Sequence, residues 1–200
     1  MRVAAFAVLI MLGPVSAFAQ APAAQPVTLA ESLQRGYANI KMNLVQSVEK
    51  MPEGDFGFKV GTMPETRTFA ALFGHVANSQ YGTCAAVKGV ANPNQGTNLE
   101  ETAKTKADVL KVLNASFTFC DDAFSGVTAN NALDMITQGR GQVTRAAALA
   151  NLVTHSNEMY GTAAAYMRAR GLVPPSTERQ QAGRGAAAPG GGGARGRGQF

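Results

Sequence analysis

The chain has 200 residues and a formal net charge of +5, and 46% of its residues are hydrophobic. Most of the net positive charge lies near the two ends: Arg2 lies close to the start, and residues 178–200 hold four arginines against one glutamate. The central part, residues 20–177, therefore carries a net charge of only about +1, so its charge does not indicate a folded nucleic-acid-binding domain.

The first nineteen residues have the pattern of a secretory signal peptide. A basic start at Arg2 precedes an apolar run over residues 3–12, and residues 17–19 form an Ala-x-Ala cleavage site. The apolar run is too short to span a bilayer. We therefore expect cleavage after Ala19, no transmembrane anchor and a periplasmic or secreted protein. Residues 20–27 are rich in Ala, Pro and Gln, which predicts a disordered spacer.

Apolar residues recur at helical spacing in the first half of the chain. A first helix is predicted from Thr28, which forms a capping box with Glu31, to about Lys50. A second helix is predicted to begin near Thr66 or Thr68 and to end at Gly89, where glycine permits a left-handed cap.

Two further helices are predicted in the second half. The third is capped by Asn98 and extends to Phe124, and the fourth opens at Thr144 and ends before Gly171. Residues 126–141 are expected to form a loop with a short helical stretch at 131–135, because no convincing strand pattern is present. The sequence thus predicts an all-α four-helix bundle over residues 28–177, followed by a disordered Gly/Arg-rich tail over 178–200.

Two histidines lie on apolar helical faces, His75 in the second helix and His155 in the fourth. Bundle cores can bind metals through side chains of facing helices, although such histidines are more often packing residues. Glu158 is a weak candidate for a third ligand. Met159, one turn after His155, would suit only a soft ion such as Cu(I).

Cys84 and Cys120 are the only cysteines. In an exported protein two cysteines suggest a disulfide. Two small buried apolar side chains are the alternative, because free cysteine is commonly buried.

Two segments together resemble a known family. Residues 63–84 read MPETRTFAALFGHVANSQYGTC, and residues 149–176 read LANLVTHSNEMYGTAAAYMRARGLVPPS. This combination resembles the DinB-like superfamily, which also includes YfiT-like metal-dependent hydrolases and bacillithiol- and mycothiol-type thiol transferases. The resemblance covers roughly residues 29–177, and its most specific part is the ending of the fourth helix.

The resemblance implies a metal site and a topology. Members of the family hold a divalent metal with one histidine of the second helix and two in an H-x-x-x-H motif of the fourth. His75 and His155 match two of these positions, and Met159 replaces the expected third histidine. The family's second and third helices run parallel, joined by a crossover. That arrangement would bring Cys84 level with Cys120 and implies a disulfide between them.

Three functions remain open at this point. The first is an exported binding module with a partial, two-histidine metal site, whose partner is an unknown small molecule or thiol. The alternative is a metal-dependent thiol S-transferase or hydrolase that uses His75 and His155, with Glu158 or water completing the site. The third is a structural or oligomerising protein, for which a homodimer is one possible form. The metal would be zinc or nickel, or copper if Met159 is a ligand, and a protein without metal is also compatible with the sequence.

Overall fold

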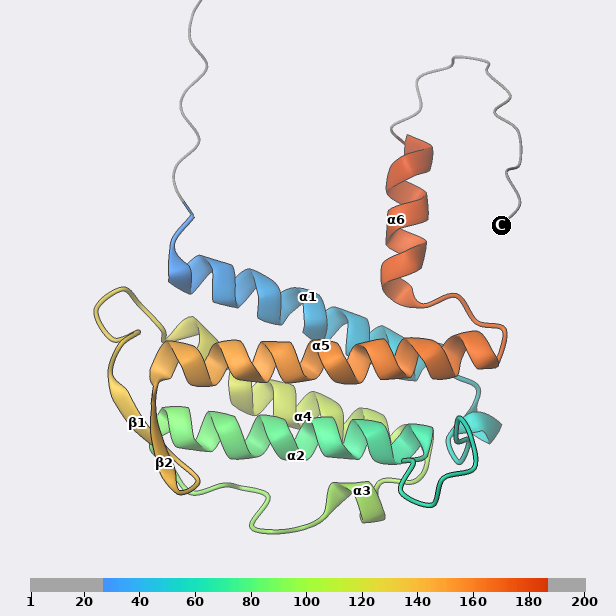
Figure 1. The fold of residues 1–200 in the computed structure, drawn as a ribbon, viewed down its shortest axis with the longest axis horizontal. Coiled ribbons are helices and arrows are strands. Elements are labelled where there is room, and N and C mark those ends of the chain that lie inside the picture. Colours follow the sequence, from blue (N-terminus) through green and yellow to red (C-terminus); the bar gives the residue numbers. More distant parts are fainter. Residues whose placement is uncertain (1–26, 187–200) are drawn as a thin grey trace, which may run out of the picture.

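The computed structural model describes residues 27–186, and the predicted signal peptide, most of the predicted spacer and residues 187–200 lie outside the described part. Its framework is four long helices packed side by side (Figure 1). These helices are α1 (Leu29–Lys50), α2 (Phe69–Lys88), α4 (Lys106–Ser125) and α5 (Arg145–Ala169). The all-α bundle predicted from the sequence is confirmed as the main architecture.

The ends of the helices are set by local side chains. Thr28 and Glu31 form the predicted capping box at the start of α1. Thr68 caps α2, and Gly89 ends that helix in the left-handed conformation at φ +65°. Each hydroxyl cap accepts a hydrogen bond from a backbone N–H that the first helical turn leaves without a partner.

The predicted third helix is divided in two. Asn98 caps a four-residue helix, α3 (Leu99–Thr102), and the chain then leaves helical geometry at Ala103. Thr105 starts α4 with a second capping box, in which Asp108 is the reciprocal acid. The division has a clear local cause, because the Thr105 side chain supplies a new helix start within a segment that the apolar pattern alone makes continuous.

Helices α2 and α4 run in the same direction, and residues 89–98 return along the bundle between them (Figure 1). In the square of four helices, α2 contacts α4 and α5, and α1 contacts the same two helices. The predicted parallel arrangement of the second and third helices is therefore present between α2 and α4.

The segment before α5 contains a β-hairpin, so the expectation of a loop with a short helical stretch was wrong there. Strand β1 (Met135–Gln138) pairs antiparallel with β2 (Gly141–Thr144). The connecting turn has Gly139 at φ +60° in its first central position, as a two-residue type II′ turn requires. The strands are short and largely polar, which explains why alternation of apolar residues did not reveal them.

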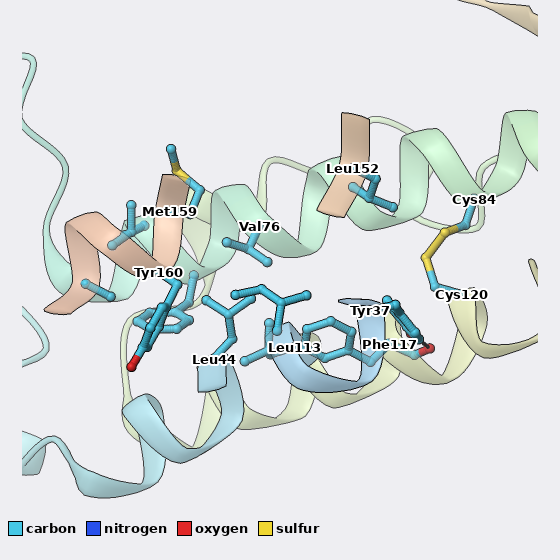
Figure 2. Close-up of a cluster of buried hydrophobic side chains, with 14 of the residues drawn as sticks. Tyr37, Leu44, Val76, Cys84, Leu113, Phe117, Cys120, Leu152, Met159 and Tyr160 are labelled. Atoms are coloured by element: carbon cyan, nitrogen blue, oxygen red, sulfur yellow. Dashed lines mark hydrogen bonds between the residues drawn. A yellow bond between two sulfur atoms is a disulfide. The ribbon is translucent and has the colours of Figure 1, made fainter. Parts of the chain in front are cut away.

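The core lies between the four long helices and contains mostly aromatic and aliphatic side chains (Figure 2). Tyr37 of α1 stacks on Phe124 of α4, with ring centroids 3.8 Å apart. Cys84 and Cys120 form a disulfide between α2 and α4, and both are fully buried. The disulfide implied by the family resemblance is thus present, near the ends of the two parallel helices.

The chain continues as helix α6 (Pro175–Ala186), past the point at which the sequence predicted the disordered tail to start. Contacts with the bundle hold its first half: Glu178 pairs with Lys50, and Arg179 donates to Gln46 and to the buried Asn43. Low sequence complexity therefore did not mark the end of ordered structure at residue 178. Among the described residues, no helix combines the length and the apolarity that a bilayer-spanning segment needs.

Candidate functional site

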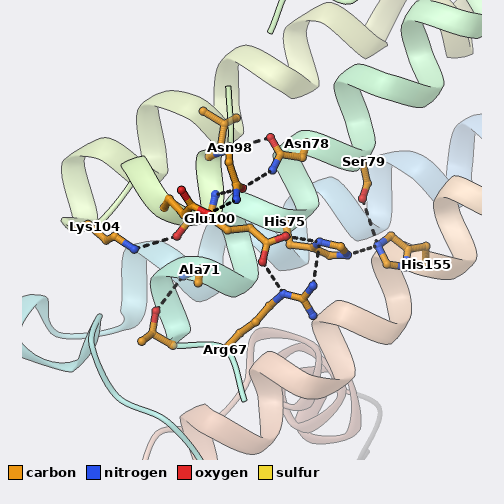
Figure 3. A network of polar contacts seen from close by, with 12 residues as sticks. Arg67, Ala71, His75, Asn78, Ser79, Asn98, Glu100, Lys104 and His155 are labelled. Atoms are coloured by element: carbon orange, nitrogen blue, oxygen red, sulfur yellow. Dashed lines mark hydrogen bonds and ion pairs between the residues drawn. The ribbon is translucent and has the colours of Figure 1, made fainter. Parts of the chain in front are cut away.

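His75 of α2 and His155 of α5 face each other across the groove between their helices (Figure 3). Their Nε2 atoms are 3.1 Å apart, and the two rings are inclined at 73°. Both side chains are partly exposed, at 25% for His75 and 30% for His155. The two histidines selected from the sequence are therefore brought together at a solvent-accessible position, and neither is a buried packing residue.

Glu100 holds the other ring nitrogen of His75. Its Oε1 lies 2.6 Å from His75 Nδ1, and its Oε2 accepts a hydrogen bond from Arg67 Nε at 2.7 Å. An ionised carboxylate can only accept, so we assign the ring proton to Nδ1 and leave Nε2 of a neutral ring with its lone pair toward His155. Arg67 Nη2 also lies 3.2 Å from Nδ1. Because both nitrogens then carry protons, this contact is a close approach of two donors and not a hydrogen bond.

The charge state of Glu100 follows from these contacts. Burial alone would raise the pKa of its carboxyl group, but the hydrogen bonds from Arg67 and His75 outweigh burial and hold the pKa below its ordinary value. Glu100 is therefore ionised at neutral pH, and it is suited to orient the imidazole ring.

Helix α3 brings Glu100 to this position. Asn98 caps the helix, and its side-chain oxygen accepts from the Glu100 N–H. Asn78 of α2 accepts a long hydrogen bond from Leu99 N at 3.4 Å. Gly74 allows the backbones to meet, because a Cβ atom at this position would lie 2.4 Å from the Leu99 carbonyl oxygen. The close contact of α2 and α3 thus places the carboxylate beside His75.

His155 has a weaker set of partners. The Ser79 hydroxyl lies 3.3 Å from Nε2, on the same side as His75. The Glu158 carboxylate lies 3.5 Å from Nδ1, the ring nitrogen that does not face His75. Glu158, selected from the sequence as a weak third ligand, is thereby placed next to the far side of the ring.

Met159 occupies the position of the expected third histidine. It is 8% exposed and belongs to the hydrophobic core. Within residues 27–186, no group of three or more His, Cys, Asp or Glu side chains could hold a metal ion. The site thus offers two imidazole nitrogens with one carboxylate on the outer nitrogen of each ring.

A pocket of about 430 Å³ adjoins His155. Helices α2 and α5 form its walls, and the turn of the hairpin closes one end. Its lining residues are Ser79, Gly82, Thr83, Gln138, Gly139, Asn151, Leu152 and His155. Another surface pocket, beside Val87 and Arg145, is larger at about 500 Å³, but neither histidine contributes to it.

Comparison with known families decides the classification. Residues 38–163 match the DinB superfamily, and this match covers more than half of the chain. The chain belongs to the DinB superfamily. The family recognised from the sequence segments around His75 and His155 is thereby confirmed.

The fold of this DinB-superfamily protein also has a solved counterpart. A DinB-like protein from Bacillus cereus ATCC 10987 superimposes with a TM-score of 0.60 over 72% of this chain and 95% of that chain. The two sequences are 14% identical, so this similarity concerns the fold alone. No curated protein matches the chain.

Sequence reasoning did not identify Glu100 and Arg67 as site residues of this DinB-superfamily protein. Glu100 directly follows the start of a helix capped by Asn98, and an acid in the first turn is favourable for any helix. Its contact with His75 spans 25 positions and depends on how α3 packs on α2. The glycine at position 74, inside an otherwise apolar helix, was the available signal that another backbone approaches there.

Proposed function

We propose that the protein is an exported binding module in which His75 and His155 together bind one divalent transition-metal ion and leave its other coordination positions to a small molecule. The observation that carries this proposal is the 3.1 Å separation of the two Nε2 atoms. Two imidazole nitrogens on one tetrahedral zinc ion, each at about 2.0–2.1 Å, are roughly 3.3 Å apart.

The carboxylates near the Nδ1 atoms of the two rings also support a metal ion between the Nε2 atoms. Metal-binding histidines usually donate their second N–H to a carboxylate or a carbonyl, which fixes the ring and directs the free lone pair at the ion. Glu100 stands in this relation to His75, and the Glu158 carboxylate lies 3.5 Å from the corresponding nitrogen of His155.

Without an ion the same contacts are less well satisfied. His75 Nε2 would then accept a hydrogen bond from the Nε2–H of His155, and a neutral His155 would present its bare Nδ1 to the Glu158 carboxylate. An ion between the rings lets each Nδ1 donate to its carboxylate. The donor set therefore fits a cation better than it fits a direct hydrogen bond between two neutral histidines.

The ligand chemistry favours zinc or nickel. Imidazole binds both ions well, whereas Cu(I) would require a soft third ligand such as a thioether. Met159 is the candidate for that role, and its burial in the core favours a packing function.

The catalytic alternative is a metal-dependent thiol S-transferase or hydrolase. A bound ion with open positions can lower the pKa of a coordinated water or thiol, which is the chemistry such an enzyme needs. The Ser79 hydroxyl, 3.3 Å from His155 Nε2, is placed to hydrogen-bond a group bound there. Two protein ligands hold an ion less firmly than three, so we favour binding as the primary role.

Export is also part of the proposal. It rests on the signal-peptide pattern of the first nineteen residues, and the Cys84–Cys120 disulfide supports an oxidising compartment. Fractionation of the source cells, with detection of the chain beginning at Gln20, tests it. A cytoplasmic protein that retains Met1 would contradict this part.

Elemental analysis and calorimetry test the metal site. Tag-free protein should contain one equivalent of zinc or nickel, and metal-free protein should bind Zn²⁺ or Ni²⁺ in a titration. The double variant His75→Ala/His155→Ala should lose this binding, while Asn157→Ala, which changes an exposed side chain of the same helix, should keep it. Equal metal binding by the double variant would contradict the proposal.

A further inference from the structure

We infer that the pocket beside His155 binds the body of a small, uncharged molecule with a largely apolar surface and a few hydrogen-bonding groups, whose metal-binding end reaches the His75–His155 pair. This inference rests on the proposed metal site and adds the chemical class of the ligand. It concerns the pocket between α2, α5 and the hairpin turn, which we call the hairpin pocket.

The hairpin pocket is continuous with the histidine pair. Ser79 lines it and also lies 3.3 Å from His155 Nε2, the atom that faces His75. A molecule held at the two Nε2 atoms can therefore extend into the pocket without crossing the bundle. The volume of about 430 Å³ falls within the range of pockets that take small organic ligands, about 300–1,000 Å³.

The lining determines which chemistry the hairpin pocket accepts. Most of its exposed surface is apolar, with Leu152 on the α5 side, and its few polar groups are the hydroxyls of Ser79 and Thr83 and the amides of Gln138 and Asn151. Apart from His155, no ionisable side chain lines it. A charged ligand body would lose hydration there without gaining an opposite charge, whereas amide or hydroxyl groups would find matching donors and acceptors.

Gly82 keeps the α2 wall of the pocket open. It lies inside α2, where glycine costs roughly 0.5–1 kcal/mol relative to alanine. No atom lies within 4 Å of the position that its Cβ would take, so packing against a neighbour does not require glycine there. The open space in front of Gly82 belongs to the pocket, and a larger side chain would fill it.

Gln138 closes the far end. Its Nε2 donates to Thr83 Oγ1 at 3.1 Å, which ties the hairpin to α2. Gly139, with its positive φ, turns the chain sharply, so strand β1 ends at Gln138 beside the pocket. The hairpin, absent from the predicted bundle, thus supplies the end wall and an amide that limits the length of the ligand.

Three hydroxamates test the inference on zinc-loaded mature protein, because a hydroxamate binds divalent metals through its two oxygen atoms. Acetohydroxamate reaches the metal only. The hydroxamate of N-acetyl-diglycine adds an uncharged peptide tail, and the hydroxamate of N-succinyl-glycine adds a tail of similar length that ends in a carboxylate. We expect the uncharged tail to improve the dissociation constant by about tenfold or more over acetohydroxamate, and the charged tail to add little.

Two glycine variants locate the tail. Gly82→Phe should remove the gain from the uncharged tail while leaving zinc and acetohydroxamate affinity unchanged. Gly161→Phe is the matched control, because Gly161 is also an exposed helical glycine with open space but lies outside the pocket; it should retain the gain.

The outcomes separate the two proposals. If zinc and acetohydroxamate bind but the uncharged tail adds nothing, or if Gly82→Phe leaves its gain intact, the hairpin-pocket inference is wrong and the metal site stands. A larger gain from the charged tail overturns the assigned ligand class. Failure of zinc itself to bind overturns the metal site and, with it, the inference.

Discussion

Gly74 and Leu99 are in direct backbone contact, and this contact connects the packing of the bundle to the chemistry of the site. A Cβ atom on residue 74 would lie 2.4 Å from the Leu99 carbonyl oxygen and 2.7 Å from the Glu100 nitrogen. Because Glu100 directly follows Leu99 and holds His75, any shift of α3 away from α2 moves the carboxylate away from the imidazole.

Gly74→Ala should therefore destabilise the protein and weaken metal binding together. The atoms that the new methyl group meets belong to backbone and cannot rotate away, and such overpacking costs about 1–3 kcal/mol. Urea denaturation and zinc titration measure the two effects. Gly82→Ala is the matched control on the same helix, since its methyl group enters open space, and it should be neutral or stabilising by up to about 1 kcal/mol. Equal stability of the two variants would refute the steric argument.

Glu100→Gln tests the orienting role of the carboxylate. The amide removes the charge that attracts the His75 N–H and Arg67, so zinc affinity should fall by about 10- to 100-fold, as is typical when an outer partner of a metal ligand is changed. Glu101→Gln alters the neighbouring acid of α3, which contacts Asn98, and it should bind zinc like the wild type. An unchanged zinc affinity in Glu100→Gln would show that the carboxylate does not orient the ring.

The disulfide should contribute strongly to stability. Cys84 and Cys120 are 36 positions apart, and a cross-link that closes a loop of this length stabilises by roughly 3–4 kcal/mol in the chain-entropy view. Wild-type protein reduced in denaturant and refolded in the presence of reductant should unfold at a lower urea concentration than the oxidised protein. The variant Cys84→Ala/Cys120→Ala should unfold at the same concentration with and without reductant. Identical midpoints for oxidised and reduced wild type would contradict the prediction.

The features that the sequence predicted depend on neighbouring residues or on the family pattern. Thr28, Thr68 and Gly89 set helix ends through contacts with residues a few positions away, and such contacts can be read from sequence. The pairing of Cys84 with Cys120 came from the parallel helices of the family. His75 and His155 were selected by their positions on apolar helical faces and match the family pattern, and the structure brings them together.

The features that were missed depend on packing between distant segments. Glu100 meets His75 only because Gly74 lets two backbones approach, and helical periodicity carries no information about that approach. The hairpin has few apolar side chains, and its clearest signal was Gly139 at the turn. Helix α6 was missed because a Gly-rich composition concealed the contacts of Glu178 and Arg179 with α1.

Tyr37 should make the stability of the protein depend on pH in the alkaline range. Burial, together with the nearby Asp121 carboxylate, raises the pKa of the Tyr37 phenol well above its ordinary value near 10. Its hydroxyl lies 2.9 Å from both the Phe117 carbonyl and Asp121, and Lys41 also pairs with Asp121. The folded protein therefore keeps the phenolic proton at a pH where the unfolded chain loses it.

The sign of the effect follows from this difference in bound protons. Above about pH 10 the unfolded chain binds fewer protons than the folded protein, so the free energy of unfolding should fall by up to about 1.4 kcal/mol per pH unit from this group alone. Below pH 10 the contribution is fully present. Urea denaturation between about pH 9 and 11 should show a steeper loss of stability in wild type than in Tyr37→Phe, which cannot ionise at this position. Parallel profiles for the two proteins would show that Tyr37 ionises equally well in both states and that its burial does not hold the proton.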